Sequence, residues 1–274
     1  MKISFWGVRG SAPVCREDIV KYGGHTPCAS ILSSKKDLII VDAGTGIIRL
    51  GETLMRKKGQ ENFHVHLVLT HFHLDHIMGL AFFAPLYSSQ AKVTFYSPLN
   101  RETTLRLLNL LMGGRFFPIN FSETESEKHF KKVPERDFTI GNINISHIPL
   151  HHPQGSFAYK FYEKGRSVVF ATDTEHPEKG VDNQLVEFAR KTDFFIYDST
   201  FTPEEYTQGK KGWGHSTWLE GVRIAKQAEV KKLYLSHFNP SHSDKKIGMI
   251  INHARKKFPQ TYGAKEGLIK ELKN

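Results

Sequence analysis

The run His71-Phe72-His73-Leu74-Asp75-His76 places four potential metal ligands within six residues. Imidazole nitrogens and carboxylate oxygens are common ligands of zinc and of other metals that catalyse hydrolysis. An extended or looping backbone sends alternate side chains the same way, so His71 and His73 can bind one ion while Asp75 and His76 turn toward a second. Two neighbouring ions can lower the pKa of a shared water and stabilise both the attacking and the leaving oxygen of a displacement. The spacing therefore predicts a dinuclear metal site.

Such a site needs further ligands from distant parts of the chain. The sequence offers them in order: His151 or His152 before Pro153, Asp173 in Ala-Thr-Asp-Thr, and His237 in Leu-Ser-His-Phe. Neighbours in an extended segment face opposite ways, so only one of His151 and His152 should be a ligand. A histidine cluster can also arise by chance or as an expression tag. A tag, however, lacks the interposed aspartate and does not follow an apolar strand, so the metal site is favoured.

Taken together, the order H-x-H-x-D-H, H-P, T-D-T, D-S-T-F, G-H-S-T and L-S-H-F resembles the metallo-β-lactamase superfamily, in its phosphodiesterase branch with RNase Z and the cyclic-phosphate hydrolases. The resemblance runs from Trp6 to His237, most of the chain. It implies an α/β fold of four layers, an αββα sandwich. It favours His152 over His151 and implies that one metal is bound by His71, His73 and His152, that the other is bound by Asp75, His76 and His237, and that Asp173 bridges them.

The resemblance also implies a catalytic pair, His215 in Gly-His-Ser-Thr and Asp198 in Asp-Ser-Thr-Phe, which serves the departing oxygen or the phosphate. Asp75 completes the expected catalytic set. Asp198 stands where RNase Z has a glutamate, whose side chain is one methylene longer. The alternative for the second motif is structural, because Ser216 or Thr217 can cap the following helix and His215 can simply precede the cap.

Two glycine-containing segments near the N-terminus, residues 6–11 and 22–26, also resemble the family. Glycine lets a backbone approach a phosphate closely, and Arg9 could grip a phosphate with two hydrogen bonds. The alternative is a tight turn after the first strand. The family more often has asparagine where this chain has His25, so His25 receives no role. The resemblance implies that Asp42 orients a ligand histidine, and the alternative for Asp42 is to cap the following helix.

Short runs rich in Ile, Val and Phe alternate with helical patterns along the chain, which predicts a layered α/β domain. No linker or repeat announces a second domain, so we expect residues 1–274 to form a single hydrolase domain. Strands are expected at residues 3–6, 29–32, 38–41, 64–70, 93–96 and 143–149, in a hairpin over 157–171, and at 194–197 and 232–235. Helices are expected up to about residue 58, after residue 76, and at 102–112, 184–190, 217–228 and 244–257.

The candidate functional residues come where these strands stop. His71, His152, Asp173, Asp198 and His237 each follow an apolar run. Open α/β sheets place their sites there because side chains from several strand ends converge. The H-F-H-L-D-H run is therefore expected on a strand-to-helix loop. Residues 113–137 are expected to form an irregular surface segment, a candidate flap over the substrate.

Composition narrows the class of protein. The chain is 39% hydrophobic and 24% charged, which is typical of a globular protein with a sizeable core. No stretch approaches the roughly 20 apolar residues of a membrane span, and the N-terminus has the pattern of a strand rather than of a signal peptide. We therefore expect no membrane contact and a cytoplasmic location. The net charge of +10 would attract anionic substrates, although scattered surface lysines account for much of it. Cys15 and Cys28 are expected as reduced thiols.

The leading hypothesis is a dinuclear metal-dependent phosphodiesterase in which a metal-activated hydroxide attacks phosphorus and His215 assists the leaving group. Small cyclic nucleotides or cyclic phosphates are the favoured substrates. Short RNA or DNA is the alternative, since the basic charge suits a nuclease. RNase Z carries a long arm between its H-P and its bridging aspartate, whereas His152 and Asp173 are joined here by a compact hairpin. The expected cofactors are two divalent ions, zinc first, then manganese or iron. Members of this branch are often homodimers, so a homodimer is also expected.

Two other classes share the fold. Thioester and lactam hydrolases carry the same H-x-H-x-D-H, but the D-S-T-F and G-H-S-T pair argues against them. Di-iron redox or sensor proteins carry a glutamate within the first motif, and this chain has none there. A degenerate binding module is disfavoured because every expected ligand is present.

Overall fold

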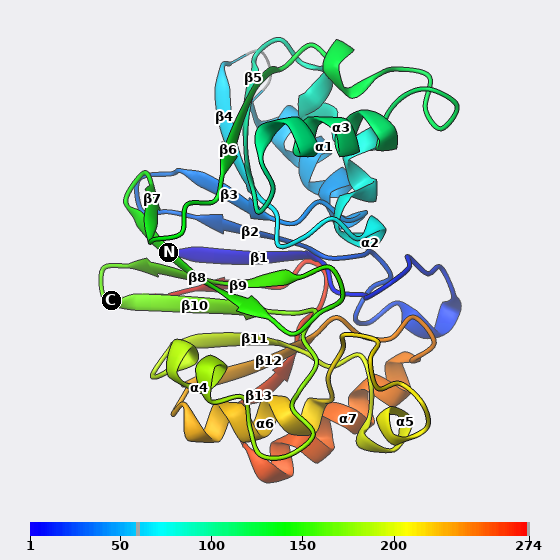
Figure 1. The fold of residues 1–274 in the computed structure, drawn as a ribbon, viewed down its shortest axis with the longest axis vertical. Coiled ribbons are helices and arrows are strands. Elements are labelled where there is room, and N and C mark those ends of the chain that lie inside the picture. The colour runs from blue at the N-terminus through cyan, green and yellow to red at the C-terminus, as the bar shows by residue number, and fades with distance from the viewer. Residues whose placement is uncertain (59–60, 273–274) are drawn as a thin grey trace.

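The computed structural model describes residues 1–58 and 61–272, and it contains two seven-stranded sheets that lie face to face (Figure 1). The first sheet consists of β1 (Lys2–Gly7), β2 (Cys28–Leu32), β3 (Leu38–Val41), β4 (Phe63–Val68), β5 (Ala91–Ser97), β6 (Glu127–Lys132) and β14 (Ile269–Glu271), in the order β14-β1-β2-β3-β4-β5-β6. Residues 59–60 and 273–274 of the expected domain lie outside the described residues.

The second sheet consists of β7 (Phe138–Ile140), β8 (Ile143–Leu150), β9 (Ser156–Glu163), β10 (Arg166–Ala171), β11 (Phe194–Asp198), β12 (Lys232–Ser236) and β13 (Thr261–Gly263), in the order β13-β12-β11-β10-β9-β8-β7. The helices are α1 (Gly46–Lys58), α2 (Leu74–Ile77), α3 (Arg101–Leu111), α4 (Asn183–Ala189), α5 (Pro203–Thr207), α6 (Trp218–Gln227) and α7 (Asp244–Lys257). Short 3-10 turns cover Glu17–Ile19, Met78–Phe82, Ala84–Tyr87 and Phe121–Glu123.

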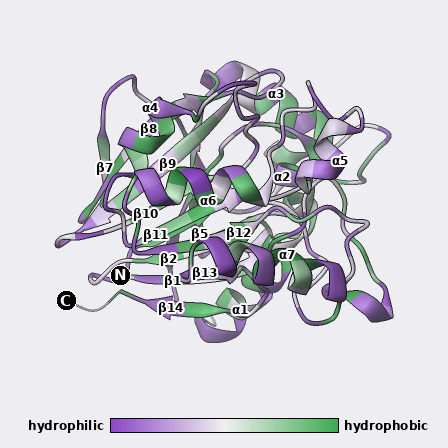
Figure 2. Cartoon of the chain, turned by 90° about the horizontal axis from the view of Figure 1, so that it is seen from below, coloured by the Kyte–Doolittle hydropathy of each residue, from purple (hydrophilic) through white to green (hydrophobic). Residues whose placement is uncertain are grey.

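Helices cover the outer face of each sheet, with α1 and α3 on the first sheet and α4, α6 and α7 on the second (Figure 1). One apolar cluster joins Ile47 and Leu50 of α1 to Leu67 of β4. Bands of hydrophobic and hydrophilic residues alternate along α6 and α7, as expected of helices with one buried face (Figure 2). The predicted αββα sandwich is therefore confirmed. Among the described residues, no helix has the length and apolar character that a bilayer-spanning segment requires.

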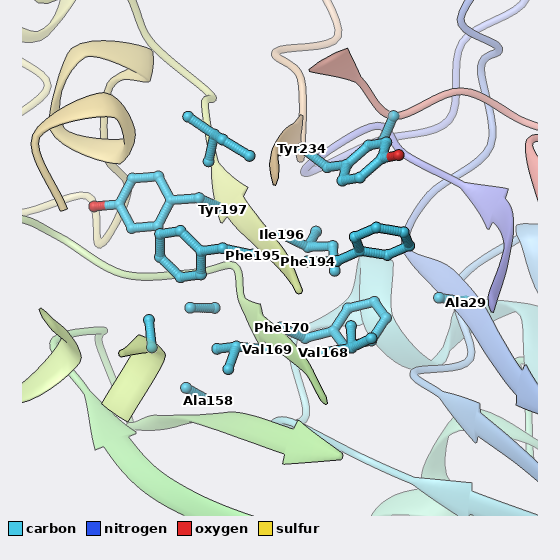
Figure 3. Packing of buried hydrophobic residues seen from close by; sticks show 14 of the residues in the cluster. Ala29, Ala158, Val168, Val169, Phe170, Phe194, Phe195, Ile196, Tyr197 and Tyr234 are labelled. Atoms are coloured by element: carbon cyan, nitrogen blue, oxygen red, sulfur yellow. The ribbon is translucent and has the colours of Figure 1, made fainter. Parts of the chain in front are cut away.

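Alternating residues of β11 supply both faces of the second sheet (Figure 3). The Phe194 ring lies 5.2 Å from that of Tyr234, which in turn lies 5.8 Å from Phe5 of β1, so this face packs on the first sheet. Tyr197 points the other way, and a Cβ added at Gly221 of α6 would lie 2.6 Å from its ring. The sequence therefore holds apolar residues on both faces of this central strand, as buried parallel strands require.

Two expectations about the elements need correction. The segment 113–137 is not irregular throughout, because residues 127–132 form β6, which pairs in parallel with β5 at the edge of the first sheet. Its Glu-Lys-His-Phe-Lys-Lys sequence is mostly charged, as edge strands often are, and this hid the strand. The helix expected after His76 is broken into α2 and two 3-10 turns, and α2 already begins at Leu74. The short strands β13 and β14 were not predicted, because three-residue strands carry almost no periodic signal.

Candidate metal centre

The H-F-H-L-D-H run changes backbone conformation halfway, and this change aims its side chains. His73 is extended, with φ −63° and ψ 149°, and α2 begins directly after it and contains Asp75 and His76. The expectation that the whole run lies on a loop is therefore wrong for these two residues. His71, Asp75 and His76 are buried, whereas His73 is half-buried.

The structure brings all seven predicted ligands together from four separate segments: residues 71–76, His152, Asp173 and His237. Their ligand atoms fall into overlapping groups in which every atom lies within 4.8 Å of the others. The groups are His71 with His73 and His152, His71 with His76 and Asp173, and Asp75 with His76 and His237. A fourth group joins Asp173, Asp198, His215 and His237. His151 is exposed and belongs to none of these groups, in agreement with the expectation that only one of the two adjacent histidines faces the centre.

One half of the centre has the spacing of a metal coordination shell. Nε2 of His76 lies 3.4 Å from Asp75 Oδ2 and 3.3 Å from Asp173 Oδ2. Nε2 of His237 lies 3.5 Å from Asp75 Oδ2 and 3.2 Å from Asp173 Oδ1. Bonds of about 2.0–2.2 Å to one tetrahedral ion would separate neighbouring ligands by roughly 3.4 Å. All four distances fit a divalent ion held by these four residues.

The other half is formed by three histidines. Nδ1 of His73 lies 2.9 Å from Nε2 of His152, and the His71 ring lies 4.6 Å and 4.9 Å from these two rings. Asp173 Oδ1 lies 4.0 Å from His71 Nε2, so its carboxylate stands between the two halves. These residues have the donor set of a second site and the position of a bridging carboxylate.

A hydrogen bond at the far ring nitrogen orients each ligand histidine. His76 Nδ1 donates to Asp42 Oδ2 at 2.9 Å, and His152 Nδ1 donates to the Gly214 carbonyl at 2.8 Å. A carboxylate and a carbonyl can only accept, so the proton sits on Nδ1 and the lone pair of Nε2 faces the centre. The remaining histidines have similar partners: Thr70 Oγ1 for His71, Gln154 Oε1 for His73 and Thr200 Oγ1 for His237.

Asp42 forms hydrogen bonds with His76 and Thr70 and does not cap the following helix. The Asp42 carboxylate accepts hydrogen bonds from both the backbone N–H and the hydroxyl of Thr70. Its backbone is left-handed, with φ +59°, a conformation that aspartate tolerates better than most residues. Asp42 therefore fixes the end of β4 and the ring of His76 at the same time.

Within the described part of the chain, several buried atoms of this cluster have no hydrogen-bond partner. They are Nε2 of His71, His76 and His237 and Oδ2 of Asp173. Buried polar atoms without partners are rare and costly, and a bound cation would supply the missing interaction. Burial would lower the pKa of His237, yet the Asp173 carboxylate raises it to about 9. The carboxylates thus attract positive charge to the place where divalent ions would sit.

The expected catalytic pair is also assembled. His215 Nδ1 donates to Asp198 Oδ2 at 3.0 Å and lies 3.9 Å from Asp173 Oδ1. Asp198 is fully buried, and its other oxygen accepts from the backbone and hydroxyl of Thr200. Thr217 caps α6, so the structural role expected for this motif exists beside the pairing of His215 with Asp198. The shorter aspartate still reaches its histidine.

The N-terminal glycine segment supports the centre rather than a phosphate. The backbone N–H of Ser11 donates to Asp75 Oδ2 at 2.8 Å, and a Cβ at Gly10 would lie 2.3 Å from the His237 ring. Arg9 is fully buried and donates to the carbonyls of Gly23, Asn239 and His242. Of the two roles that the sequence left open, Arg9 therefore does not take that of a phosphate ligand, because its buried guanidinium binds backbone carbonyls of neighbouring loops.

Sequence reasoning missed several residues that hold the site. Glu175 accepts hydrogen bonds from Tyr206 Oη and from the backbone N–H of Gly212 and Gly214, and so anchors the loop that carries His215. Thr70 and Gln154 were also not singled out. The only signal was position, since each lies next to or near a predicted ligand. His25, left without a role, has its Nδ1 3.1 Å from Thr45 Oγ1.

The chain resembles known proteins in sequence and in fold. The family model of the "Beta-lactamase superfamily domain" matches residues 38–238, a segment that contains all seven predicted ligands. A ribonuclease Z of Thermoplasma acidophilum is 24% identical over 255 residues, a match that covers 76% of this chain and 79% of the relative. The structure of the metallo-beta-lactamase fold protein YhfI from Bacillus subtilis matches with a TM-score of 0.72 and 20% identity, covering 98% of both chains. A diphosphatase from the PhnP family matches with a TM-score of 0.70 and 19% identity, covering 99% of this chain and 98% of that one. The chain therefore belongs to the metallo-β-lactamase superfamily, in its ribonuclease Z-like branch of metal-dependent hydrolases.

Proposed function

We propose that this protein is a dinuclear metal-dependent phosphodiesterase whose preferred substrates are small cyclic nucleotides or cyclic phosphates. The observation that carries the proposal is the His215–Asp198 pair, whose imidazole lies 3.9 Å from the carboxylate shared by the two halves of the metal centre. A proton donor beside a pair of ion sites suits the breaking of a P–O bond, in which the leaving oxygen needs a proton.

The metal ligands in this proposal are the seven residues assembled above: His71, His73, His152, Asp75, His76, His237 and the bridging Asp173. Two bound divalent ions would supply an activated water and neutralise charge that builds on the phosphate oxygens. Zinc is our first choice because nitrogen-rich sets of histidine and carboxylate suit it, and manganese or iron is the alternative. Asp75 is held by Ser11 N–H, so the backbone as well as the histidines keeps its carboxylate turned inward.

His215 is proposed to donate a proton to the departing oxygen. Its Nδ1 is occupied by the buried Asp198 carboxylate, which fixes the ring and leaves Nε2 as the atom that can face a substrate. The side chain of His215 is 13% exposed, so a bound phosphodiester can reach it. The protonated ring is the form of His215 that would deliver a proton to the leaving oxygen.

Substrates are proposed to be small because the segment between His152 and Asp173 carries no arm. It consists of β9 and β10, which turn at Lys164 and Gly165 and pair directly as two central strands of the second sheet. A ribonuclease activity on short RNA is the second candidate, favoured by the ribonuclease Z relatives and by the net charge of +10. The homodimer remains a prediction from the family resemblance.

Turnover of a substrate panel tests the proposal. The panel contains 2′,3′-cyclic and 3′,5′-cyclic nucleotides, short RNA, S-lactoylglutathione and a chromogenic cephalosporin, all assayed with protein loaded with zinc or manganese. We expect cyclic phosphodiesters to be hydrolysed fastest. Carbonyl hydrolysis without phosphodiester turnover would reverse the assignment, and dominant cleavage of RNA would favour the nuclease. A di-iron absorption spectrum in protein purified without chelator would point to redox chemistry instead.

His215→Ala should lower kcat on the best cyclic phosphodiester by about 10²- to 10⁴-fold, the usual contribution of a positioned general acid. Metal content should stay the same, because His215 is not among the proposed ligands. The matched control is His253→Ala, an exposed histidine of α7. Full turnover by the His215 variant on every substrate would remove His215 from the mechanism.

A further inference from the structure

A cavity of about 550 Å³ lies beside the metal centre and shares the His152 side chain with it. Its walls come from the β8–β9 loop, the segment after β10, and α5 with the loop that follows it. The lining includes His151, Pro153, His176, Pro177, Tyr206 and Lys211. Its volume falls within the range of small-molecule pockets. His152 is also a proposed metal ligand, so an occupant of this cavity would lie one side chain away from a phosphate at the metals.

Aromatic and apolar side chains form part of the walls. The rings of His176 and Tyr206 lie 4.3 Å apart, and Pro153, Pro177 and Leu150 add apolar area. Aromatic side chains stack on the faces of nucleobases, which all present a flat π surface. These walls suit a flat heterocycle better than a flexible or highly hydrated group.

The polar groups of the cavity favour a neutral occupant over a second phosphate. Two carboxylates, Glu175 and Glu178, are part of the lining and would repel an anion. Glu175 already accepts three hydrogen bonds, from Tyr206 and from the backbone of Gly212 and Gly214, so it shapes the wall. Lys211, the lining lysine, is paired with Glu178 at the exposed rim.

Two histidines remain available to recognise the edge of a base. His176 Nδ1 lies 3.0 Å from Ser216 Oγ, which leaves its Nε2 for a ligand. The backbone carbonyl of the exposed His151 accepts a hydrogen bond from Glu175 N–H, and no hydrogen bond of its ring is found among the described residues. Imidazole nitrogens can donate or accept, and base edges offer both kinds of partner.

We infer that this cavity binds the nucleobase of a nucleoside phosphodiester whose phosphate lies at the metal centre. The inference rests on the proposed phosphodiesterase activity and narrows its substrates from cyclic phosphates in general to nucleotides. His151 and His176 are then specificity-determining residues that contact the base, and His152 separates the base from the metals.

Paired substrates test this inference. The first is 2′,3′-cyclic AMP, and the second is glycerol 1,2-cyclic phosphate, which has the same strained phosphodiester ring without a base. We expect the ratio of their kcat/KM values to fall about tenfold in His151→Ala and in His176→Ala. The ratio should not change in His129→Ala, an exposed histidine of β6. A ratio that stays at the wild-type value in both cavity variants would overturn the inference, even if each variant lost activity on both substrates equally.

Binding of adenosine separates failure of the inference from failure of the proposed function. Adenosine has a base but no phosphodiester, so calorimetric titration needs no turnover. We expect wild-type protein to bind adenosine and both cavity variants to bind it about tenfold more weakly. Absence of binding in the wild type would overturn the base cavity while leaving phosphodiesterase activity untouched. Binding of adenosine without hydrolysis of either cyclic phosphate would instead refute the phosphodiesterase proposal.

Discussion

The orientation of each ligand histidine depends on the residue that is hydrogen-bonded to its far ring nitrogen as much as on the position of the histidine in its motif. Asp42 shows this most directly. Its Oδ2 accepts a hydrogen bond from His76 Nδ1 at 2.9 Å, and its carboxylate also accepts two hydrogen bonds from Thr70. Sequence alone left Asp42 with two roles, a helix cap or a support for a histidine. The contact of Asp42 with His76 and Thr70 depends on how β3 lies beside the end of β4, and a local sequence pattern does not predict that arrangement.

Asp42→Asn should weaken metal binding about 10- to 100-fold, the usual effect of removing such a support. Asparagine tolerates the left-handed backbone at this position, so folding should survive. Competition with a chromophoric zinc chelator measures the change, and Asp18→Asn, an exposed residue near the N-terminus, is the control. Unchanged zinc affinity in Asp42→Asn would mean that His76 needs no partner.

The loops between secondary-structure elements hold the proposed ligands in place, and two of these loops pass close to a ligand histidine at a glycine. The loop between α5 and α6 bends at Gly214, with φ +78°, and a Cβ there would lie 2.3 Å from His152 Nδ1. The loop after β1 places Gly10 equally close to the ring of His237. Glycine therefore marks the places where a backbone passes a proposed ligand in close contact.

Gly214→Ala should destabilise the fold by about 1–3 kcal/mol, because the backbone is left-handed and the new methyl meets His152. It should also lower metal content. The control is Gly248→Ala, in the interior of α7 with no atom near the added Cβ, which should stabilise by about 0.5–1 kcal/mol. Urea unfolding measures both. Equal effects of the two substitutions would contradict the proposed contact.

The strand β4 carries a histidine whose titration should affect stability. Burial, followed by the neighbouring His64, lowers the pKa of His66 to about 4. The unfolded chain takes up this proton near pH 6.5, so the contribution of His66 to stability is complete above pH 6.5 and falls as the pH decreases toward 4.

Between pH 7 and pH 5 the wild type should lose about 1 kcal/mol more stability than His66→Gln does, a figure reduced for partial exposure. Urea unfolding at the two pH values gives this difference. The ring of His66 also lies 4.0 Å from that of His64, so His64→Gln should be measured beside it. Parallel pH profiles of wild type and His66→Gln would refute the assignment.

At the scale of the whole molecule, the first and last strands meet in one sheet. β1 pairs with β2 on one side and with β14 on the other, so the two ends of the described chain are tied together. One apolar cluster contains residues of both sheets, from Ile3 to Leu272. We propose that residues 1–274 form a single domain and that the metals stabilise it by joining loops from both sheets.

Removal of metal with chelator should therefore lower the midpoint of thermal unfolding, and zinc should restore it. An ion at 100 times its dissociation constant adds about 2.7 kcal/mol to stability. Scanning calorimetry should give one transition with and without metal, whereas two transitions would refute the single domain. Asp173→Asn is the matched variant, and its midpoint should not respond to zinc.

The sequence by itself predicted the class of fold. Through its resemblance to the metallo-β-lactamase superfamily, it also predicted the seven candidate ligands and the pair His215 and Asp198. All of these except His215 lie in short motifs at or just after the end of an apolar strand. The sequence also determined that strands and helices alternate, since period and composition are local properties. The edge strand β6, the buried role of Arg9 and the partners of the ligand histidines were decided only by the tertiary structure. Hydrogen bonds such as that from His152 to Gly214 join residues 62 positions apart. No local pattern encodes such contacts, because they depend on how the two sheets pack and on which loops that packing brings together.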